Sequence, residues 1–179
     1  AKWGDSMALD LGTESPFTFD ELYFSRKDRK GIIESGNSVF QRVSQYDWND
    51  LLKKPHSLIR HPAMPRGVFH LLWETILAGK PIGAYVVNRA QDGSHYWVFA
   101  LVTPVDGGFV SVRLKPGSAF FPIVKEKYEE LLNLEKAKNL FPKDSQQVLL
   151  KVIQSLGFRD YRHFMTDALT AELEYRQEA

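Results

Sequence analysis

Three strand-like runs in the middle of the chain are separated by turns that are too short for anything but antiparallel pairing. The runs cover residues 81–89, 95–104 and 108–114, and the dipeptides Asp92-Gly93 and Asp106-Gly107 lie between them. Asp-Gly is favoured in tight hairpin turns because glycine adopts a positive φ without steric cost. Parallel strands would instead need crossovers of a dozen or more residues. The sequence therefore predicts an antiparallel meander.

Two shorter apolar runs come before the meander and predict a further hairpin. They cover residues 19–25 and 31–35, and the charged link between them, residues 26–30, is expected to form a solvated tip. A helix is expected from Asn37 to Ser44, with Asn37 as its N-cap, and a second short helical piece follows around residues 48–52. The clearest helix begins at Pro65 and ends at Gly79.

Helices replace strands after Pro116-Gly117. Apolar residues recur at helical spacing in residues 123–138, in residues 145–156 and from about residue 160 onward. These stripes need partners, either the sheet of the same chain, a second copy of the chain, or both. Alternation along a strand places Tyr96 and Trp97 on opposite faces of the sheet. One of them is expected to line the pocket side, and the other can receive the C-terminal helices.

The amino-acid composition limits which classes of protein the chain can belong to. The 179 residues are enough for one main core, and 23 Lys plus Arg against 22 Asp plus Glu give no overall field toward nucleic acid or anionic lipid. There is no cysteine, which suits a reducing cytoplasm and excludes thiolate chemistry. No apolar run approaches the roughly 20 residues that cross a bilayer. We therefore expect a cytoplasmic protein that binds neither nucleic acid nor membrane.

Motifs for catalysis and metal binding are absent. The sequence contains no G-x-S-x-G, G-x-G-x-x-G or G-x-x-x-x-G-K-[ST] segment. No two histidines show the H-x-x-x-H or H-E-x-x-H spacing of a metal site. We therefore expect neither a metal site nor an enzyme. The first residue is Ala and a methionine stands at position 7, so the segment before Met7 is interpreted as vector-derived or as part of a larger protein.

A series of short motifs carries a resemblance to a known family. The segment Arg60-His61-Pro62-Ala63-Met64-Pro65 has the pattern R-H-P-x-M-P. It is followed in order by Gly79-Lys80-Pro81, Asn88-Arg89, Gly93-Ser94-His95-Tyr96-Trp97-Val98 and Ser111-Val112-Arg113. This order of motifs and elements, over about residues 19–114, resembles the flavin-binding PAS domains of bacterial aerotaxis receptors.

The resemblance implies an α+β fold of the PAS type. A five-stranded antiparallel sheet with small helices on one face would enclose a cofactor pocket, and a helical C-terminal extension would follow. On this basis the chain divides into an N-terminal tail (residues 1–18), a PAS sensor domain (19–115) and the helical extension (116–179). In that family the bound FAD changes its redox state and the output passes to a chemotaxis signalling domain.

The resemblance also implies a set of site residues. Arg60 and His61 would lie beside the flavin, where a guanidinium pairs with phosphate or carbonyl oxygens and an imidazole contacts the ring edge. Asn88 would offer its amide to the polar face of the flavin. Phe69 and Trp73 are the aromatic residues expected to touch a ligand while also belonging to the core.

Two positions depart from the family pattern. Ala63 stands where the family has aspartate, and Ile82 stands where it has tryptophan, and both positions belong to the flavin environment in that family. Three cofactor states therefore stay open: FAD, haem with His61 as axial ligand, or no cofactor. The leading hypothesis is a cytoplasmic PAS sensor, expected to form a homodimer, that binds a redox or small-molecule ligand and relays its state to a downstream signalling partner. The alternative is a cofactor-free PAS module whose sheet and tail mediate homodimer formation.

Overall fold

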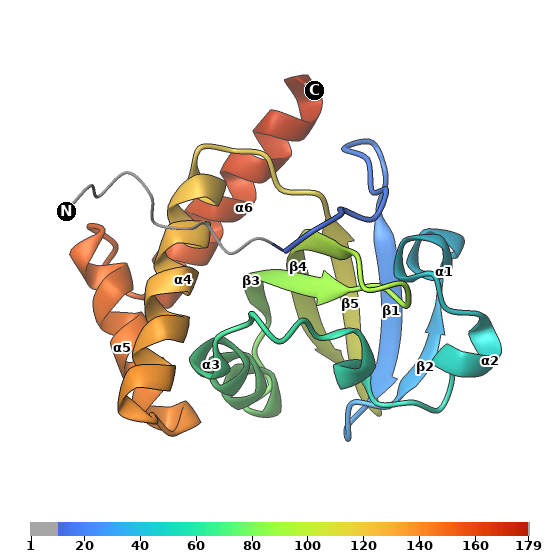
Figure 1. Ribbon diagram of the computed structural model, residues 1–179, viewed down its shortest axis with the longest axis horizontal. Coiled ribbons are helices and arrows are strands. Elements are labelled where there is room, and N and C mark those ends of the chain that lie inside the picture. Colours follow the sequence, from blue (N-terminus) through green and yellow to red (C-terminus); the bar gives the residue numbers. More distant parts are fainter. Residues whose placement is uncertain (1–10, 179) are drawn as a thin grey trace.

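The computed structural model describes residues 11–178 (Figure 1). The interpretation of the segment before Met7 falls outside these residues. The strands are β1 (Tyr23–Asp28), β2 (Ile33–Gly36), β3 (Ile82–Arg89), β4 (His95–Val105) and β5 (Gly108–Leu114). The helices are α1 (Ser38–Ser44), α2 (Trp48–Leu51), the 3₁₀ helix η1 (His56–Ile59), α3 (Arg66–Leu77), α4 (Phe120–Lys138), α5 (Pro142–Ser155) and α6 (Tyr161–Glu178).

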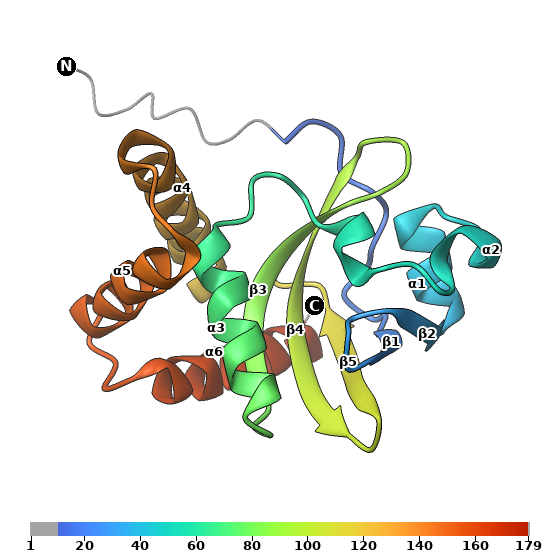
Figure 2. The ribbon, with the colours of Figure 1, turned by 90° about the horizontal axis from the view of Figure 1, so that it is seen from below.

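The five strands form one antiparallel sheet in the order β2-β1-β5-β4-β3. The predicted meander is confirmed, with Asn88 of β3 opposite Tyr96 of β4 and Ala100 of β4 opposite Arg113 of β5. Between β2 and β3 the chain crosses the sheet through α1, α2, η1 and α3 (Figures 1 and 2). The face that these helices cover is called the inner face below. The predicted α+β PAS fold is thus confirmed, including the small helices on one face and the helical C-terminal region.

The first hairpin differs from its prediction at the charged link. β1 continues to Asp28, so the first part of the charged link belongs to the strand. The turn that follows is stabilised by the Asp28 carboxylate, which accepts hydrogen bonds from the backbone N–H groups of Lys30 and Ile32. Strand alternation then sends Lys27 to the inner face with Tyr23 and Ser25. Lys27 is only 5% exposed, so the expectation that it lies on a solvated tip was wrong.

The three C-terminal helices pack against the same chain. α5 lies along α3, and α6 lies against β3 (Figure 2). Leu149 and Ile153 of α5 and Phe164 of α6 are each 4% exposed. Trp97 packs against Phe121 and Tyr128 of α4, while Tyr96 packs on Tyr23 toward the inner face. Of the three arrangements that the sequence left open for the apolar stripes (the same chain, a second copy, or both), the structure shows packing on the same chain.

Gly67 sets how closely α5 approaches α3. Its N–H donates to the Ser145 hydroxyl at 3.2 Å, and a Cβ at this position would lie 2.5 Å from that hydroxyl. The Ser145 hydroxyl in turn donates to Glu135 at 2.7 Å, and Glu135 also accepts from the Arg66 N–H at 2.8 Å. Because the first N–H groups of a helix have no partner within it, Glu135 completes the start of α3. A small residue on α3 and a carboxylate on α4 thus fix three helices together.

β3 is an edge strand, and its outward backbone groups are bonded to other parts of the chain. Tyr161 of α6 donates its hydroxyl to the Gly83 carbonyl at 2.7 Å, and Tyr128 of α4 does the same to the Tyr85 carbonyl at 2.7 Å. The Val87 carbonyl accepts from the His61 N–H at 3.3 Å. An exposed edge would invite pairing with another strand, so these bonds protect it.

Glu172 fastens α6 to the rest of the molecule. It is 1% exposed and accepts hydrogen bonds from the backbone N–H groups of Gly117 and Ser118 at 2.8 and 2.6 Å. The hydroxyl of Tyr85, on β3, also donates to it at 3.1 Å. Burial, followed by the nearby Glu172 carboxylate, raises the pKa of Tyr85, so that this hydroxyl stays a donor. One carboxylate therefore joins α6, the β5–α4 connection and β3.

None of the described helices has the length and apolar character needed to span a bilayer.

Replacing Glu172 by Ala should destabilise the fold by about 2–4 kcal/mol, because three buried donors lose their acceptor. Glu172→Gln, which keeps one acceptor oxygen, should cost less. Urea unfolding gives the free energy, and hydrogen exchange at α6 should become faster in the alanine variant. Glu174→Ala, an exposed change on the same helix, is the control and should stay within about 0.5 kcal/mol of the parent. Equal losses in the two alanine variants would contradict the role given to Glu172.

Candidate functional site

A cavity of about 230 Å³ lies on the inner face of the sheet. Its floor comes from β1, β3, β4 and β5, and its walls come from η1, the residues around it and α3. The lining side chains fall into three groups: cationic and imidazole, aromatic, and aliphatic or small polar. They include Lys27, Lys30, His56, Arg60, Phe69, Trp73, Val86, Asn88, Ala100, Val102 and Arg113.

Aromatic rings and cations meet along the α3 side of this inner cavity. The Arg60 guanidinium lies 3.9 Å from the centroid of the Phe69 ring, and the Lys27 amine lies 5.1 Å from the Trp73 ring. Both distances are within the range of cation–π attraction. Phe69 and Trp73 are four residues apart on α3, so they share one face of that helix. The wall that they form can therefore stack against a planar ligand.

Two polar groups on the floor keep hydrogen-bonding capacity that the described chain does not use. Asn88 is 3% exposed and Arg113 is 4% exposed. Among residues 11–178, neither Asn88 Nδ2 nor Arg113 Nε has a hydrogen-bond partner. Burying a polar group without a partner costs free energy, and such groups are rare in folded proteins. Both atoms belong to residues that line the inner cavity, so they are available to an acceptor placed there.

Arg113 is held in place by its other nitrogens. It donates to the Ser25 hydroxyl at 2.8 Å and lies 3.0 Å from His56 Nε2. Burial and then the charge of Arg113 hold the pKa of His56 well below its usual value, so His56 is neutral and can accept this bond. Arg113 thus has a fixed position, and its Nε–H has no partner among the described residues.

The charges that surround the inner cavity have one sign. Burial, and after it the nearby charges of Arg113 and Arg60, together lower the pKa of Lys27 to about 7. Within the described part of the chain, no carboxylate forms an ion pair with Lys27, Arg60 or Arg113. A cluster of unpaired cations in a buried place creates a positive potential that favours an anion.

The structure places four of the six residues predicted for the site around the inner cavity: Arg60, Phe69, Trp73 and Asn88. Arg60 and Asn88 also form an antiparallel backbone bridge. The other two do not line it. His61 follows Arg60 in extended backbone, so its ring points away, and its Nδ1 accepts from the Ala63 N–H at 2.9 Å. Ile82 begins β3, six residues from Asn88.

Sequence reasoning missed Lys27, His56 and Arg113 as members of the site. Arg113 stood in one of the motifs that carried the resemblance, and alternation along β1 from Tyr23 would have sent Lys27 inward. The signal was hidden by the cluster of charges around Lys27, which is typical of a solvated turn. Of the two departures from the family pattern, neither Ala63 nor Ile82 lines the inner cavity.

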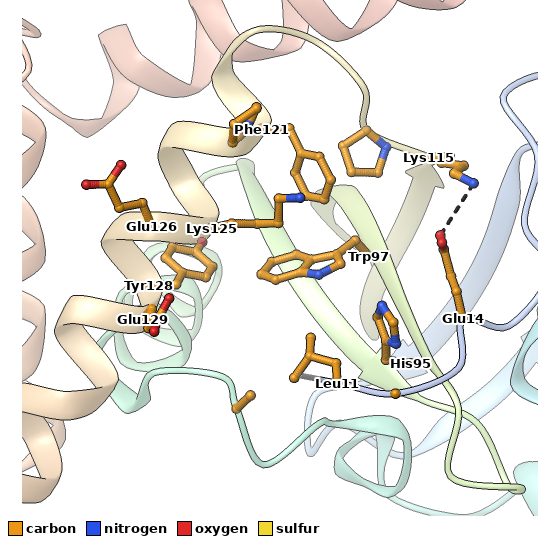
Figure 3. Close-up of a pocket in the computed structure, with 14 residues that line it drawn as sticks. Leu11, Glu14, His95, Trp97, Lys115, Phe121, Lys125, Glu126, Tyr128 and Glu129 are labelled. Atoms are coloured by element: carbon orange, nitrogen blue, oxygen red, sulfur yellow. Dashed lines mark ion pairs between the residues drawn. The ribbon is translucent and has the colours of Figure 1, made fainter. Parts of the chain in front are cut away.

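A second cavity of about 720 Å³ lies on the other side of the sheet, between the segment around Leu11, the start of β4 and α4 (Figure 3). Trp97, Phe121 and Tyr128 surround it, and Ala63 also lines it. At its rim Glu14 pairs with Lys115 at 3.4 Å. None of its lining residues is among the described side chains that are buried without a hydrogen-bond partner. Of these two cavities, only the inner one is lined by described residues with buried donors that lack a partner, Asn88 and Arg113.

Comparison with known proteins agrees with this architecture. Residues 33–113 match the family model described as PAS fold. The aerotaxis receptor of Escherichia coli (strain K12) is 33% identical over 122 residues, which is 65% of this chain and 24% of the receptor. The nitrogen fixation regulatory protein of Klebsiella pneumoniae is 31% identical over 81 residues, which is 45% of this chain and 16% of that protein.

A solved structure shows the same fold at low identity. The blue-light activated histidine kinase of Erythrobacter litoralis EL346 superposes with a TM-score of 0.50 at 15% identity, over 55% of this chain and 34% of that chain. The match spans about a quarter or less of the two curated relatives. Together with the sheet order, these matches show that the chain contains a PAS sensor domain similar to that of aerotaxis receptors.

The Lys27→Met variant should be more stable than the parent at pH 7, by on the order of 2 kcal/mol. Lys27 has a pKa of about 7 in the folded protein and about 10.4 when unfolded, so the unfolded chain binds the proton more tightly. The cost to the folded state is complete below pH 7 and shrinks as the pH rises toward 10. Urea unfolding at pH 6, 7 and 9 measures it. Lys143→Met, an exposed change on α5, is the control. A gain that does not depend on pH would contradict this assignment.

Proposed function

We propose that this PAS domain is a sensory module that binds a small anionic ligand in the inner cavity and relays its presence to the C-terminal helices. The observation that carries the proposal is a group of cations without carboxylate partners that lines the cavity, two of them buried (Lys27 and Arg113), with Asn88 Nδ2 and Arg113 Nε left without acceptors among the described residues. An anion placed there would satisfy both atoms and would offset the mutual repulsion of Lys27, Arg60 and Arg113. The proposal covers this domain, since its curated relatives are several times longer.

The size of the cavity limits the ligand. About 230 Å³ is below the roughly 300–1,000 Å³ of pockets that hold drug-sized molecules. A carboxylate metabolite of a few heavy atoms fits this space. Guanidinium groups such as those of Arg60 and Arg113 recognise carboxylates through paired N–H donors, which gives direction as well as charge. A small carboxylate is therefore the ligand that the volume and the donors support together.

A signal from the cavity has a short path to the C-terminal helices through β3. Asn88 faces the cavity, and Tyr85, three residues earlier on the same strand, bonds to Glu172 of α6. Tyr128 and Tyr161 hold the edge of β3 to α4 and α6. A ligand acts as a signal only through different affinities for two arrangements. A change in how β3 lies on these helices is the arrangement that we propose the ligand selects, for a downstream signalling partner to read.

Small carboxylates should raise the melting temperature of the full chain more than chloride does at equal ionic strength, because a ligand that binds the folded state stabilises it. The probes are acetate, succinate and pyruvate, followed by thermal unfolding and calorimetry. Arg60→Met should weaken the binding of the best probe about tenfold, which corresponds to about 1.4 kcal/mol. Arg89→Met is the matched control, because Arg89 is an exposed arginine that does not line the cavity. If no carboxylate raises the melting temperature more than chloride does, the result would contradict the proposal and favour the cofactor-free interaction module.

Flavin is a second candidate ligand, favoured by the similarity to the aerotaxis receptor. The Asn88 amide and Arg113 suit the carbonyl edge of a flavin ring, and Trp73 could stack on it. The volume of the inner cavity does not hold the whole dinucleotide, so FAD does not fit the site in this arrangement. Haem, which is also larger, would lack His61 as a ligand inside the cavity.

Incubation with FAD followed by gel filtration should leave no stoichiometric flavin on the protein, because binding would require the α3 wall to move. The visible absorbance of the protein fraction is the measurement. If flavin is retained, and its binding is lost in Asn88→Leu but kept in Arg89→Met, the ligand of this site is FAD and not a small carboxylate.

A further inference from the structure

Lys27 is a buried primary amine with a free end. Within residues 11–178 the amine of Lys27 forms no hydrogen bond and no ion pair. It lies over the face of the Trp73 ring, 5.1 Å from the ring centroid. It is 5% exposed, and it lines the inner cavity. A lysine in a protein interior usually has a carboxylate beside it. The lack of one here leaves the nitrogen of Lys27 open toward the cavity.

Burial, and after it the positive charges near this amine, lower its pKa. Arg113 on β5, Arg60 after η1 and His56 on η1 are the titratable groups near it on the elements packed around the cavity, and Lys30 lies in the turn beside it. All are cationic or neutral. Together with burial they bring the pKa of Lys27 to about 7, so a large part of the amine is unprotonated at neutral pH. An amine desolvated beside other cations is the form in which lysine acts as a nucleophile.

We propose that Lys27 captures a small 2-oxo acid in the inner cavity as an imine, while the arginines beside it hold the carboxylate of the ligand. The proposal rests on the small-carboxylate site described above and names the class of ligand. It follows from the position of the amine on β1, in the same cavity of about 230 Å³ that Arg60 and Arg113 also line. A carboxylate alone uses the arginines, whereas a carbonyl carbon next to it also uses the free amine.

The chemistry needs no further reagent. The nitrogen lone pair of Lys27 adds to the carbonyl carbon, and the carbonyl oxygen becomes the hydroxyl of a carbinolamine. Loss of that hydroxyl with a proton as water then leaves a carbon–nitrogen double bond. Nothing is oxidised or reduced, and the two reactants equal the imine plus one water. Because the step is reversible, it suits a sensor that follows the concentration of its ligand.

The size of the cavity and the sign of its charges favour a 2-oxo acid over other carbonyl compounds. A neutral aldehyde would consume the amine and leave the guanidinium of Arg113 without an anion. A sugar phosphate would supply the anion but would exceed the space available. A 2-oxo acid places its carboxylate on the atom next to the carbonyl, so one small molecule meets both the amine and a guanidinium.

Trapping by reduction tests the proposal. The full chain is incubated at pH 7 with pyruvate and cyanoborohydride, which reduces imines to stable amines. Intact mass and peptide mapping should show one adduct on Lys27, heavier than the parent by the mass of pyruvic acid less one oxygen atom. Lactate, the 2-hydroxy analogue without a carbonyl group, should give none. Exposed lysines such as Lys143 should react far more slowly, because no cavity holds the pyruvate carboxylate beside their amines.

The variants separate this proposal from the one on which it rests. Lys27→Arg keeps a cation and should give no adduct, and Lys27→Met should give none while remaining folded. If pyruvate raises the melting temperature but leaves no adduct on Lys27, the small-carboxylate site stands and the imine proposal fails. If adducts spread evenly over exposed lysines, the imine proposal also fails. If pyruvate neither protects the protein nor reacts with Lys27, both proposals fail.

Discussion

The position of β3 at the edge of the sheet is the constraint on which the rest of the structure depends. An edge strand has backbone groups that must find partners, and here Tyr128, Tyr161 and the backbone of His61 supply them. The tyrosines come from α4 and α6, so satisfying the edge brings the C-terminal helices onto the sheet. The buried carboxylate of Glu172 then completes the attachment through Tyr85. The helices that follow the PAS domain are therefore a structural part of it.

The inner face differs from the edge, because it holds buried polar groups whose hydrogen bonds the fold does not satisfy. A core that served stability alone would place apolar side chains where Lys27, Asn88 and Arg113 lie. These residues instead carry unpaired charge or unused donors into a cavity, which lowers the stability of the folded state. Residues that cost stability in this way are typical of binding sites. The two faces of the sheet thus differ: the outer face and the edge stabilise the fold, and the inner face carries the site that we propose for the ligand.

Much of the fold could be predicted from local sequence signals. The turns at Asp92-Gly93 and Asp106-Gly107 fixed the meander, and Asn37 does cap α1 by accepting from the Phe40 N–H. The direction in which the C-terminal helices fold could not be predicted, because it depends on long-range contacts such as the close approach of Gly67 to Ser145. The charged residues around Lys27 were misassigned because composition favours a solvated turn, whereas strand register decides which of them is buried.

The site was partly predictable for the same reasons. Arg60, Phe69, Trp73 and Asn88 stand in or near motifs, and helix periodicity or the family resemblance was enough to select them. His61 was selected with Arg60 as a pair, but consecutive residues in extended backbone point to opposite sides, so only one of the two can face the cavity.

The same alternation rule acts along β3, where Asn88 faces the inner cavity while Tyr85 faces the C-terminal helices. A strand that is buried on both faces and bonded at its edge has little freedom to move alone. Any displacement that a ligand causes at Asn88 must therefore be taken up by the tyrosine hydrogen bonds that hold α4 and α6, which makes those bonds the place where occupancy of the cavity becomes a change in the helices.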